Sequence, residues 1–223
     1  MSRMIPAALV LFVAAPLFAD DDLKVKTEKT APPAELKDAI RSLLDEDAVT
    51  VLGPSGDAMA TFWFRQVLPS KAAPEQVAGG LTYREIQPTT VVGAVRFPQA
   101  WSDYRKQKIP AGVYTLRLAV QPENGDHMGT APYNDFLLLS PAAKDTSADT
   151  MEPKELHELS AGAPGGSHPG VLLLYPNSKP EDEPKVVSKG AGVLVLNVKR
   201  PVDVSGTKAS LGFGLTVIGQ TKE

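Results

Sequence analysis

The chain has 223 residues, no cysteine, and 23 Lys and Arg residues against 26 Asp and Glu residues, which gives a formal net charge of −3 at pH 7. The lack of cysteine excludes disulfide bridges, thiolate metal sites and thiol catalysis, so the fold must be stabilised by packing alone. The mild acidity argues against nucleic-acid binding, which normally leaves a basic patch. Twenty prolines and eighteen glycines predict many turns between short elements.

Residues 1–19, MSRMIPAALVLFVAAPLFA, have the layout of a secretory signal peptide. A single basic residue, Arg3, precedes a short uncharged apolar stretch that ends at the small residue Ala19. The stretch is shorter than the roughly 20 apolar residues that a membrane-spanning helix needs, and it contains two prolines. We therefore expect cleavage near Ala19 rather than a retained anchor, and a secreted or periplasmic protein with no membrane span.

The segment that follows the signal peptide is charged and polar, and we predict a flexible leader over residues 20–33. Residues 34–223 are expected to form one domain, which begins with a helix over 34–47. Its apolar residues Leu36, Ile40, Leu43 and Leu44 recur at the spacing of one helical face. This stripe is expected to pack on its own domain; a helix that binds a partner is the alternative.

After the first helix the hydrophobic pattern changes to a period of two, which predicts strands. The strands are expected at 48–52, 58–68, 89–97, 112–121, 136–140, 171–175, 193–198 and 211–218. One more short helix is predicted in EPKELHELS, with Thr150 as its cap and Pro153 in its first turn. About seven to nine strands with turns between them predict a mainly β fold, an antiparallel β-sandwich of immunoglobulin-like or jelly-roll-like type with one or two short helices.

Two of the predicted strands have features that bear on packing. In 112–121, apolar residues alternate with Thr115, Arg117 and Ala119, which predicts a sheet with one buried face. In the last strand, Gly212 and Gly214 lie between large apolar residues. Because glycine has no side chain, these positions allow another backbone to lie close.

The segment from Lys108 to Leu116, KIPAGVYTL, resembles the Pro-Ala-Gly-x-Tyr-x-Leu strand lead-in of several secreted bacterial β-sandwich families. These include a domain family of unknown function, carboxypeptidase-regulatory-like modules and other immunoglobulin-like modules. The wider block from Gly93 to Leu139 is similar to a group of uncharacterised secreted bacterial proteins. The resemblance implies a β-sandwich and export, and it supplies no catalytic residues.

Two glycine-rich loops carry histidines that could bind a metal. His127 lies in NGDHMG and His168 in GGSHPG. If the two loops meet at one end of the fold, the imidazoles could bind copper or zinc, with Asp126 as a further ligand and Met128 as a soft ligand suited to copper. A histidine that only fixes a turn by hydrogen bonding is the alternative.

The sequence WSDYR places two aromatic side chains, an acid and a base in one expected loop. Trp101, Tyr104 and Arg105 could stack on a sugar ring or contact a protein partner. The alternative is that the two rings close one end of the sheet and Arg105 remains in solvent.

A third hypothesis is hydrolysis, with Ser167 and His168 completed by Asp126 or Asp135. Adjacent residues of an extended segment point to opposite faces, and the chain contains no Gly-x-Ser-x-Gly sequence. We therefore expect an exported, non-catalytic binding or structural protein of the cell envelope or extracellular space, with a protein or carbohydrate partner. A periplasmic metal-binding protein that uses His127 and His168 is the first alternative, and a hydrolase is the second.

Overall fold

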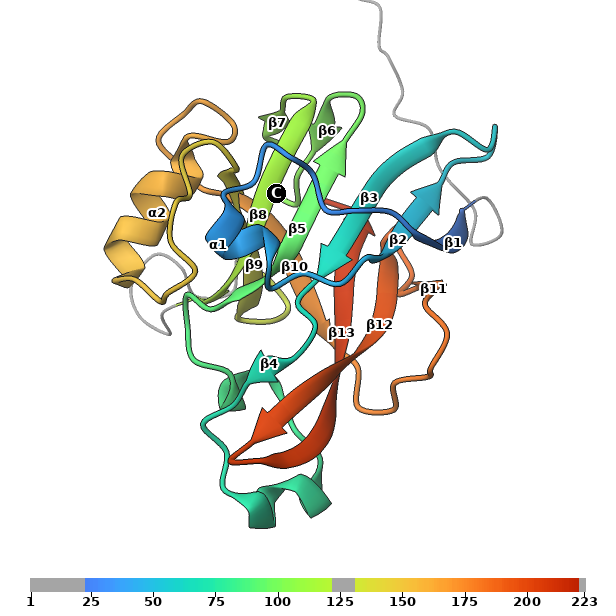
Figure 1. The fold of residues 1–223 in the computed structure, drawn as a ribbon. Helices are drawn as coiled ribbons and strands as arrows, with labels where there is room; N and C mark the ends of the chain where they lie inside the picture. The colour runs from blue at the N-terminus through green and yellow to red at the C-terminus, as the bar shows by residue number, and fades with distance from the viewer. Residues whose placement is uncertain (1–22, 122–130, 221–223) are drawn as a thin grey trace, which may run out of the picture.

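The computed structural model describes residues 23–121 and 131–220, and the fold in these ranges is mainly β (Figure 1). The strands are β1 Lys24–Lys29, β2 Asp47–Leu52, β3 Ala58–Phe64, β4 Leu68–Pro69, β5 Val91–Phe97, β6 Trp101–Ser102, β7 Lys108–Ile109, β8 Gly112–Val120, β9 Asp135–Pro141, β10 Gly170–Pro176, β11 Lys185–Ser188, β12 Leu194–Val204 and β13 Thr207–Ile218. The helices are α1 Asp38–Arg41, α2 Pro153–Ala161 and the 3-10 turns η2 Pro74–Gly79 and η3 Tyr83–Glu85. No helix in the described ranges is long and apolar enough to cross a membrane.

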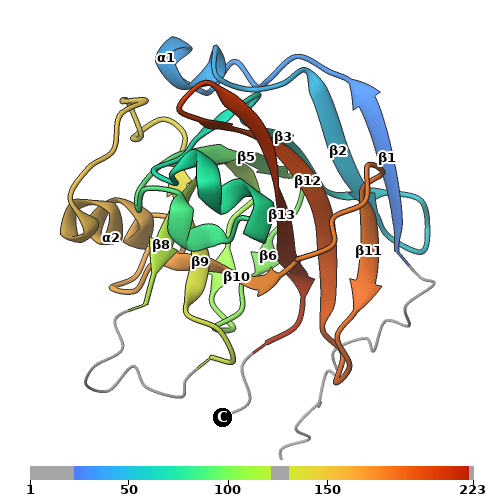
Figure 2. The ribbon, with the colours of Figure 1, turned by 90° about the horizontal axis from the view of Figure 1, so that it is seen from below.

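Most strands belong to one continuous sheet, in the order β1-β2-β3-β5-β8-β9-β10-β13-β12-β11. Neighbours in this order are antiparallel, while the short strand β4 pairs parallel with β12. The sheet curls so strongly that its two edge strands, β1 and β11, approach each other (Figure 2). The hairpin β6–β7 forms a separate two-stranded sheet.

The inner face of the curled sheet encloses the main hydrophobic core. Alternate residues of each strand point into it, among them Phe62, Phe64, Leu116, Phe213 and Leu215. Two smaller clusters lie on the outer face, one under α1 and one under α2. The prediction of a mainly β fold with few short helices is confirmed; the immunoglobulin-like or jelly-roll-like type stays a prediction.

The expected flexible leader is wrong for residues 24–29, because these residues form the edge strand β1. Lys24 pairs with Leu52 and Lys29 with Asp47 in a continuous antiparallel register. Val25 packs against the main core, whereas most of the other β1 side chains are exposed. A polar strand at an edge has little hydrophobic alternation, so its sequence is typical of a linker.

The predicted helix over 34–47 is reduced to the single turn of α1. The stripe still packs as expected, since Leu36, Ile40 and Leu44 are buried together against Trp63. The helix ends early because Leu44 pairs with Arg65 next to the end of β3. The backbone after α1 therefore pairs with the chain at the end of β3 instead of continuing the helix.

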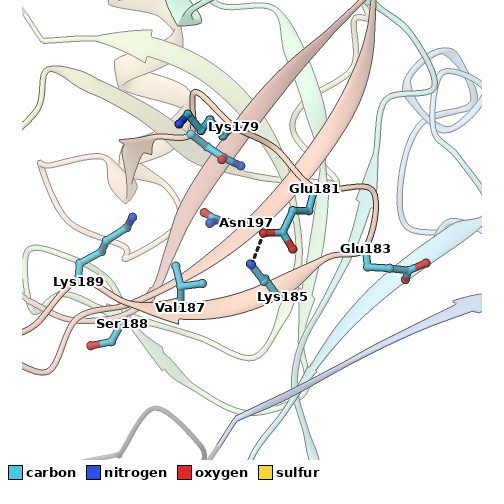
Figure 3. A pocket seen from close by; sticks show the side chains of 9 residues that line it. Lys179, Glu181, Glu183, Lys185, Val187, Ser188, Lys189 and Asn197 are labelled. Carbon is cyan, nitrogen blue, oxygen red and sulfur yellow. Dashed lines mark hydrogen bonds and ion pairs between the residues drawn. The ribbon is translucent and has the colours of Figure 1, made fainter.

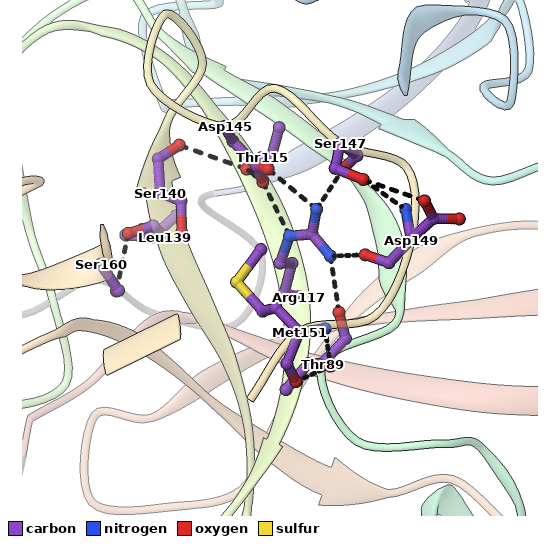
Figure 4. A network of polar contacts seen from close by, with 10 residues as sticks. All are labelled: Thr89, Thr115, Arg117, Leu139, Ser140, Asp145, Ser147, Asp149, Met151 and Ser160. Atoms are coloured by element: carbon purple, nitrogen blue, oxygen red, sulfur yellow. Dashed lines mark hydrogen bonds and ion pairs between the residues drawn. The ribbon is translucent and has the colours of Figure 1, made fainter. Parts of the chain in front are cut away.

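The expectation of one buried face for β8 is wrong, because Thr115 and Arg117 on its outer face are fully buried. The Arg117 guanidinium forms two 2.8 Å contacts with the Asp145 carboxylate, through Nε and one terminal nitrogen (Figure 4). The other terminal nitrogen donates to the carbonyl oxygens of Thr89 and Asp149, each at 2.8 Å. Thr115 also donates to the Asp145 carboxylate, at 2.5 Å. The connection from β9 to α2 thus covers the strand.

Helix α2 forms where the sequence predicts a short helix, and Pro153 is in its first turn as expected. Thr150 is not the cap: the N-cap position is Glu152, whose side chain makes no capping hydrogen bond. Leu156 packs into the outer cluster under α2, and Ser160 donates to the carbonyl oxygen of Leu139 at 2.7 Å. These contacts hold the helix on β9.

The KIPAGVYTL segment leads into β8. Tyr114 and Leu116 lie in the main core. The Tyr114 hydroxyl donates to the carbonyl oxygen of Pro110, four residues upstream, at 2.8 Å. A tyrosine that reaches back to the chain before its own strand is the arrangement called a tyrosine corner in immunoglobulin-like sheets. The motif therefore has a structural explanation.

Candidate binding site

The side chains of the predicted aromatic loop separate in the structure. Trp101 is half-buried and stacks on Phe97, with ring centroids 4.8 Å apart. Tyr104 is buried in the outer cluster under α2, and Arg105 is exposed. The two rings contribute to different clusters, Trp101 to the main core and Tyr104 to the outer cluster under α2. A binding role for Trp101, Tyr104 and Arg105 stays a prediction.

Asp103, between these rings, is a fully buried residue whose role the sequence did not indicate. One carboxylate oxygen accepts hydrogen bonds from the backbone N–H groups of Arg105 and Gln107, at 2.9 and 2.8 Å. The other accepts from the Gln107 amide at 2.9 Å and from the backbone N–H of Val171 at 3.1 Å. Asp103 therefore ties the β6–β7 turn to the start of β10.

Of the predicted metal ligands, only His168 is in the described ranges, where it is exposed in the loop between α2 and β10. Asp126, His127 and Met128 lie outside the described residues. The strand register gives the attachment points of their loop: Val120 pairs with Asp135, while the His168 loop enters β10 beside Leu139. The two loops thus start from opposite ends of β9.

No group of three or more potential metal-ligating side chains occurs in residues 23–121 and 131–220. The copper or zinc site at His127 and His168 stays a prediction. The same register bears on the hydrolysis hypothesis. Gly170 pairs with Leu139, and Asp135 lies four residues before Leu139 on β9. That spacing corresponds to roughly 14 Å. Asp135 and the Ser167–His168 pair therefore lie at opposite ends of the strand.

A different set of polar residues converges on the outer face of the sheet. Tyr175 on β10 pairs with Gly214 on β13, Gly214 with Asn197 on β12, and Asn197 with Lys185 on β11. Residues directly opposite one another in neighbouring strands share one face of a sheet. Their strand neighbours Leu174, Leu196 and Val186 point inward to the main core. The four residues therefore form one row across four strands.

The connection between β10 and β11, residues 177–184, folds back over this row and encloses a hollow of about 200 Å³. Asn197 and Val187 form its floor, and its sides include Lys179, Glu181 and Lys189. We call it the Asn197 hollow. Figure 3 shows Asn197 among the lysine side chains, while Glu183 points away from them.

Ion pairs fix the segment that covers the Asn197 hollow. Glu181 pairs with Lys185 of β11, and Asp182 with Lys199 of β12 at 2.8 Å. Asn177 donates to the carbonyl oxygen of Phe213 at 3.2 Å. The charged residues that line the hollow are three lysines and two glutamates: Lys179, Lys185, Lys189, Glu181 and Glu183. With Glu181 paired with Lys185, the other charged lining residues are Lys179, Lys189 and Glu183, and Glu183 points away from the two lysines (Figure 3).

The Asn197 side chain is the polar centre of the hollow. Its Oδ1 atom is buried and has no hydrogen-bond partner in the structure. This atom leans over Gly214, where an added Cβ would lie 3.1 Å from it. A buried amide oxygen without a donor costs free energy, and here it is covered by its neighbours in the sheet.

An aromatic pair adjoins the hollow at the other end of the row. The Tyr133 ring meets the Tyr175 ring edge-on, with centroids 4.9 Å apart. The Lys189 ammonium lies 6.0 Å from the Tyr175 ring centroid, and Lys189 also lines the hollow. Burial, followed by the influence of Tyr104 and Tyr133, raises the pKa of Tyr175. Its phenol therefore stays protonated and able to donate.

Tyr83 supports this arrangement from the inner side of the sheet. Its hydroxyl donates to the carbonyl oxygen of Tyr175 at 2.7 Å and accepts from the backbone N–H of Gly214 at 3.0 Å. Its ring packs on Phe213, with centroids 5.2 Å apart. One side chain thus joins β10 to β13 directly beneath the row.

Comparisons of the chain with protein families, with characterised proteins and with solved structures found no match. The resemblance of KIPAGVYTL to secreted bacterial β-sandwich families stays a prediction. The function of this surface has to be argued from its geometry and charge.

Proposed function

We propose that this protein is an exported, non-catalytic binding protein, and that the Asn197 hollow binds an anionic group of its ligand. The observation that carries the proposal is the position of Lys179 and Lys189 on the sides of a hollow in which Glu181 is already paired with Lys185. The two ammonium groups would attract a negative charge on the ligand.

The first nineteen residues support the export half of the proposal. A cleavable signal directs the domain to the periplasm or outside the cell, where polar envelope and extracellular molecules are available as ligands. The half that concerns binding is supported by the rigidity of the site. The row lies on four hydrogen-bonded strands, and the covering segment begins at Asn177, which packs on Gly212 and donates to the carbonyl oxygen of Phe213. A site on a rigid scaffold loses little conformational entropy on binding.

An NMR titration of the isotope-labelled mature protein with sulfate and with tetraglutamate tests this function. We expect both anions to shift backbone amides in 177–189 and 195–199, and the cationic probe tetralysine to leave them unchanged. The exposed charge reversals Lys179→Glu and Lys189→Glu should abolish the shifts, whereas Lys71→Glu, on the exposed surface elsewhere, should retain them. Absence of any anion-dependent shift in these segments would overturn the proposal.

A further inference from the structure

The aromatic pair beside the hollow narrows the chemical class of the ligand. Tyr133 is one of the few large apolar side chains that remain exposed in the described ranges, at 37%. It meets the half-buried ring of Tyr175, which lies in the same cross-strand row as Asn197. Tyrosine rings beside hydrogen-bonding side chains suit a flat ligand with one apolar face and a polar rim. A pyranose ring has this character.

The spacing of the row sets the size of the ligand. Tyr175 and Asn197 lie on strands separated by one intervening strand, which places their backbones about 10 Å apart. The intervening residue of the row is the buried Gly214, and the Asn197 amide lies over it, 3.1 Å from the position of an added Cβ. A molecule that contacts both the ring of Tyr175 and the hollow over β12 therefore extends beyond one sugar ring.

The charge of the ligand follows from Lys189, which belongs to both parts of the site. Its ammonium lies 6.0 Å from the centroid of the Tyr175 ring, and its side chain lines the Asn197 hollow. A carboxylate on a sugar bound between the two would pair with this cation. Lys179, on the covering segment, provides a second cation for the next acidic unit.

From these contacts we infer that the ligand is an acidic carbohydrate of at least two sugar units, with one ring on Tyr175 and Tyr133, a carboxylate on Lys189, and a second acidic unit at Lys179. The inference rests on the proposed function, since it names the ligand class of the same hollow. An acidic peptide would satisfy the lysines but would make no use of the aromatic pair.

Isothermal titration calorimetry of the mature protein tests the inference with four probes: trigalacturonate, the neutral trisaccharide maltotriose, tetraglutamate and sulfate. We expect trigalacturonate to bind at least tenfold more tightly than each of the others, and to be recovered uncleaved after incubation. Lys189→Ala and Tyr175→Ala should each weaken its binding by tenfold or more. Tyr175→Phe, which keeps the ring, should weaken it much less. Lys71→Ala is the remote control.

The outcomes separate the two proposals. If tetraglutamate binds as tightly as trigalacturonate, or if Tyr175→Ala leaves trigalacturonate binding unchanged in a protein whose thermal unfolding is unaltered, the carbohydrate inference is overturned and anion binding stands. Equal affinity for maltotriose overturns the acidic part of the inference. If no anionic probe binds, the proposed function itself is overturned. Lys189→Ala alters only a surface side chain, so its result does not depend on whether the Tyr175 variant folds.

Discussion

Arg117 and Asp145 form an ion pair from which solvent is fully excluded, since neither side chain has any exposed area. All five N–H donors of the guanidinium have an acceptor, provided by the carboxylate and by the carbonyl oxygens of Thr89, Ser147 and Asp149 (Figure 4). The pair joins the middle of the sheet to the connection that leads to α2. A buried pair of this kind is costly to break, because the remaining charge is left without a partner.

The substitution Asp145→Ala should therefore destabilise the protein by about 3 to 5 kcal/mol, the usual cost of removing one partner of a buried pair. Urea unfolding followed by circular dichroism measures the loss. Replacement of both partners with apolar residues, Arg117→Met with Asp145→Leu, should cost less than Asp145→Ala because no unpaired charge remains. A double variant that is less stable than the single one would contradict this account.

The exposed pair Lys26–Glu28 on β1 is the matched control for that experiment. Its atoms are 2.6 Å apart, yet the two side chains are 56% and 46% exposed. Solvent screens such pairs, so Glu28→Ala should change the free energy of unfolding by less than about 1 kcal/mol. A larger loss would mean that the pair also fixes the edge strand.

We expect that Gly212 cannot be replaced by a larger residue without cost. The sequence of the last strand predicted that another backbone lies close to this position. A Cβ added at Gly212 would lie 2.1 Å from the carbonyl oxygen of Asn177, so the backbone of the covering segment must move. We expect Gly212→Ala to cost about 1 to 3 kcal/mol, as other over-packed sites do. It should also weaken anion binding, because the displaced segment carries Lys179. Urea unfolding and calorimetry check the two effects.

Gly166→Ala is the control for the Gly212 substitution. An added Cβ there meets no atom within 4 Å, and the residue is exposed in the loop after α2. Stability and anion binding should both remain within experimental error of the parent protein. If Gly212→Ala behaves in the same way as Gly166→Ala, the close approach of Asn177 is not a constraint on the fold.

The sequence predicted most of the sheet because a strand with one face on the core shows a period of two. Phe62 and Phe64 point inward and Trp63 outward, as the alternation requires. The sequence also indicated that another backbone would lie close to Gly212 and Gly214, and Asn177 and Tyr175 fill those positions. These features depend on neighbours in the chain or on the geometry of one strand.

The features that the sequence did not predict depend on residues far apart in the chain. A charged residue such as Arg117 in an alternating strand normally faces solvent, and nothing local indicates that Asp145 will cover it. The same holds for the Asn197 hollow, whose row joins Tyr175, Asn197 and Lys185 through strand pairings that no single segment reveals. The charged segment 177–184 therefore resembled an ordinary connection.

If the protein is exported as proposed, we expect the mature chain to begin near Asp20. Cleavage after Ala19 removes the apolar stretch and leaves β1 only a few residues from the new N-terminus. N-terminal sequencing and intact mass of the protein recovered from the periplasmic or culture fraction of a bacterial host check this expectation. Ala19→Arg places a large basic residue at the cleavage position and should leave the signal attached. Recovery of the parent protein in the membrane fraction with Met1 retained would contradict export by a cleaved signal.

The anchoring of the segment over the Asn197 hollow should depend on pH through Asp182. The hydrogen bond from Lys199, followed by the positive charge of that lysine, lowers the pKa of the Asp182 carboxyl. Because the pKa is lower in the folded protein than in the unfolded chain, the stabilisation is present above the ordinary aspartate pKa of about 4 and is lost as the pH falls through the depressed value. A carboxyl-carbon NMR titration should therefore place the Asp182 midpoint below that of an unpaired aspartate. Lys199→Met should return the midpoint to the ordinary range, whereas Lys71→Met should not move it. An unchanged midpoint in Lys199→Met would mean that the ion pair does not hold the segment in solution.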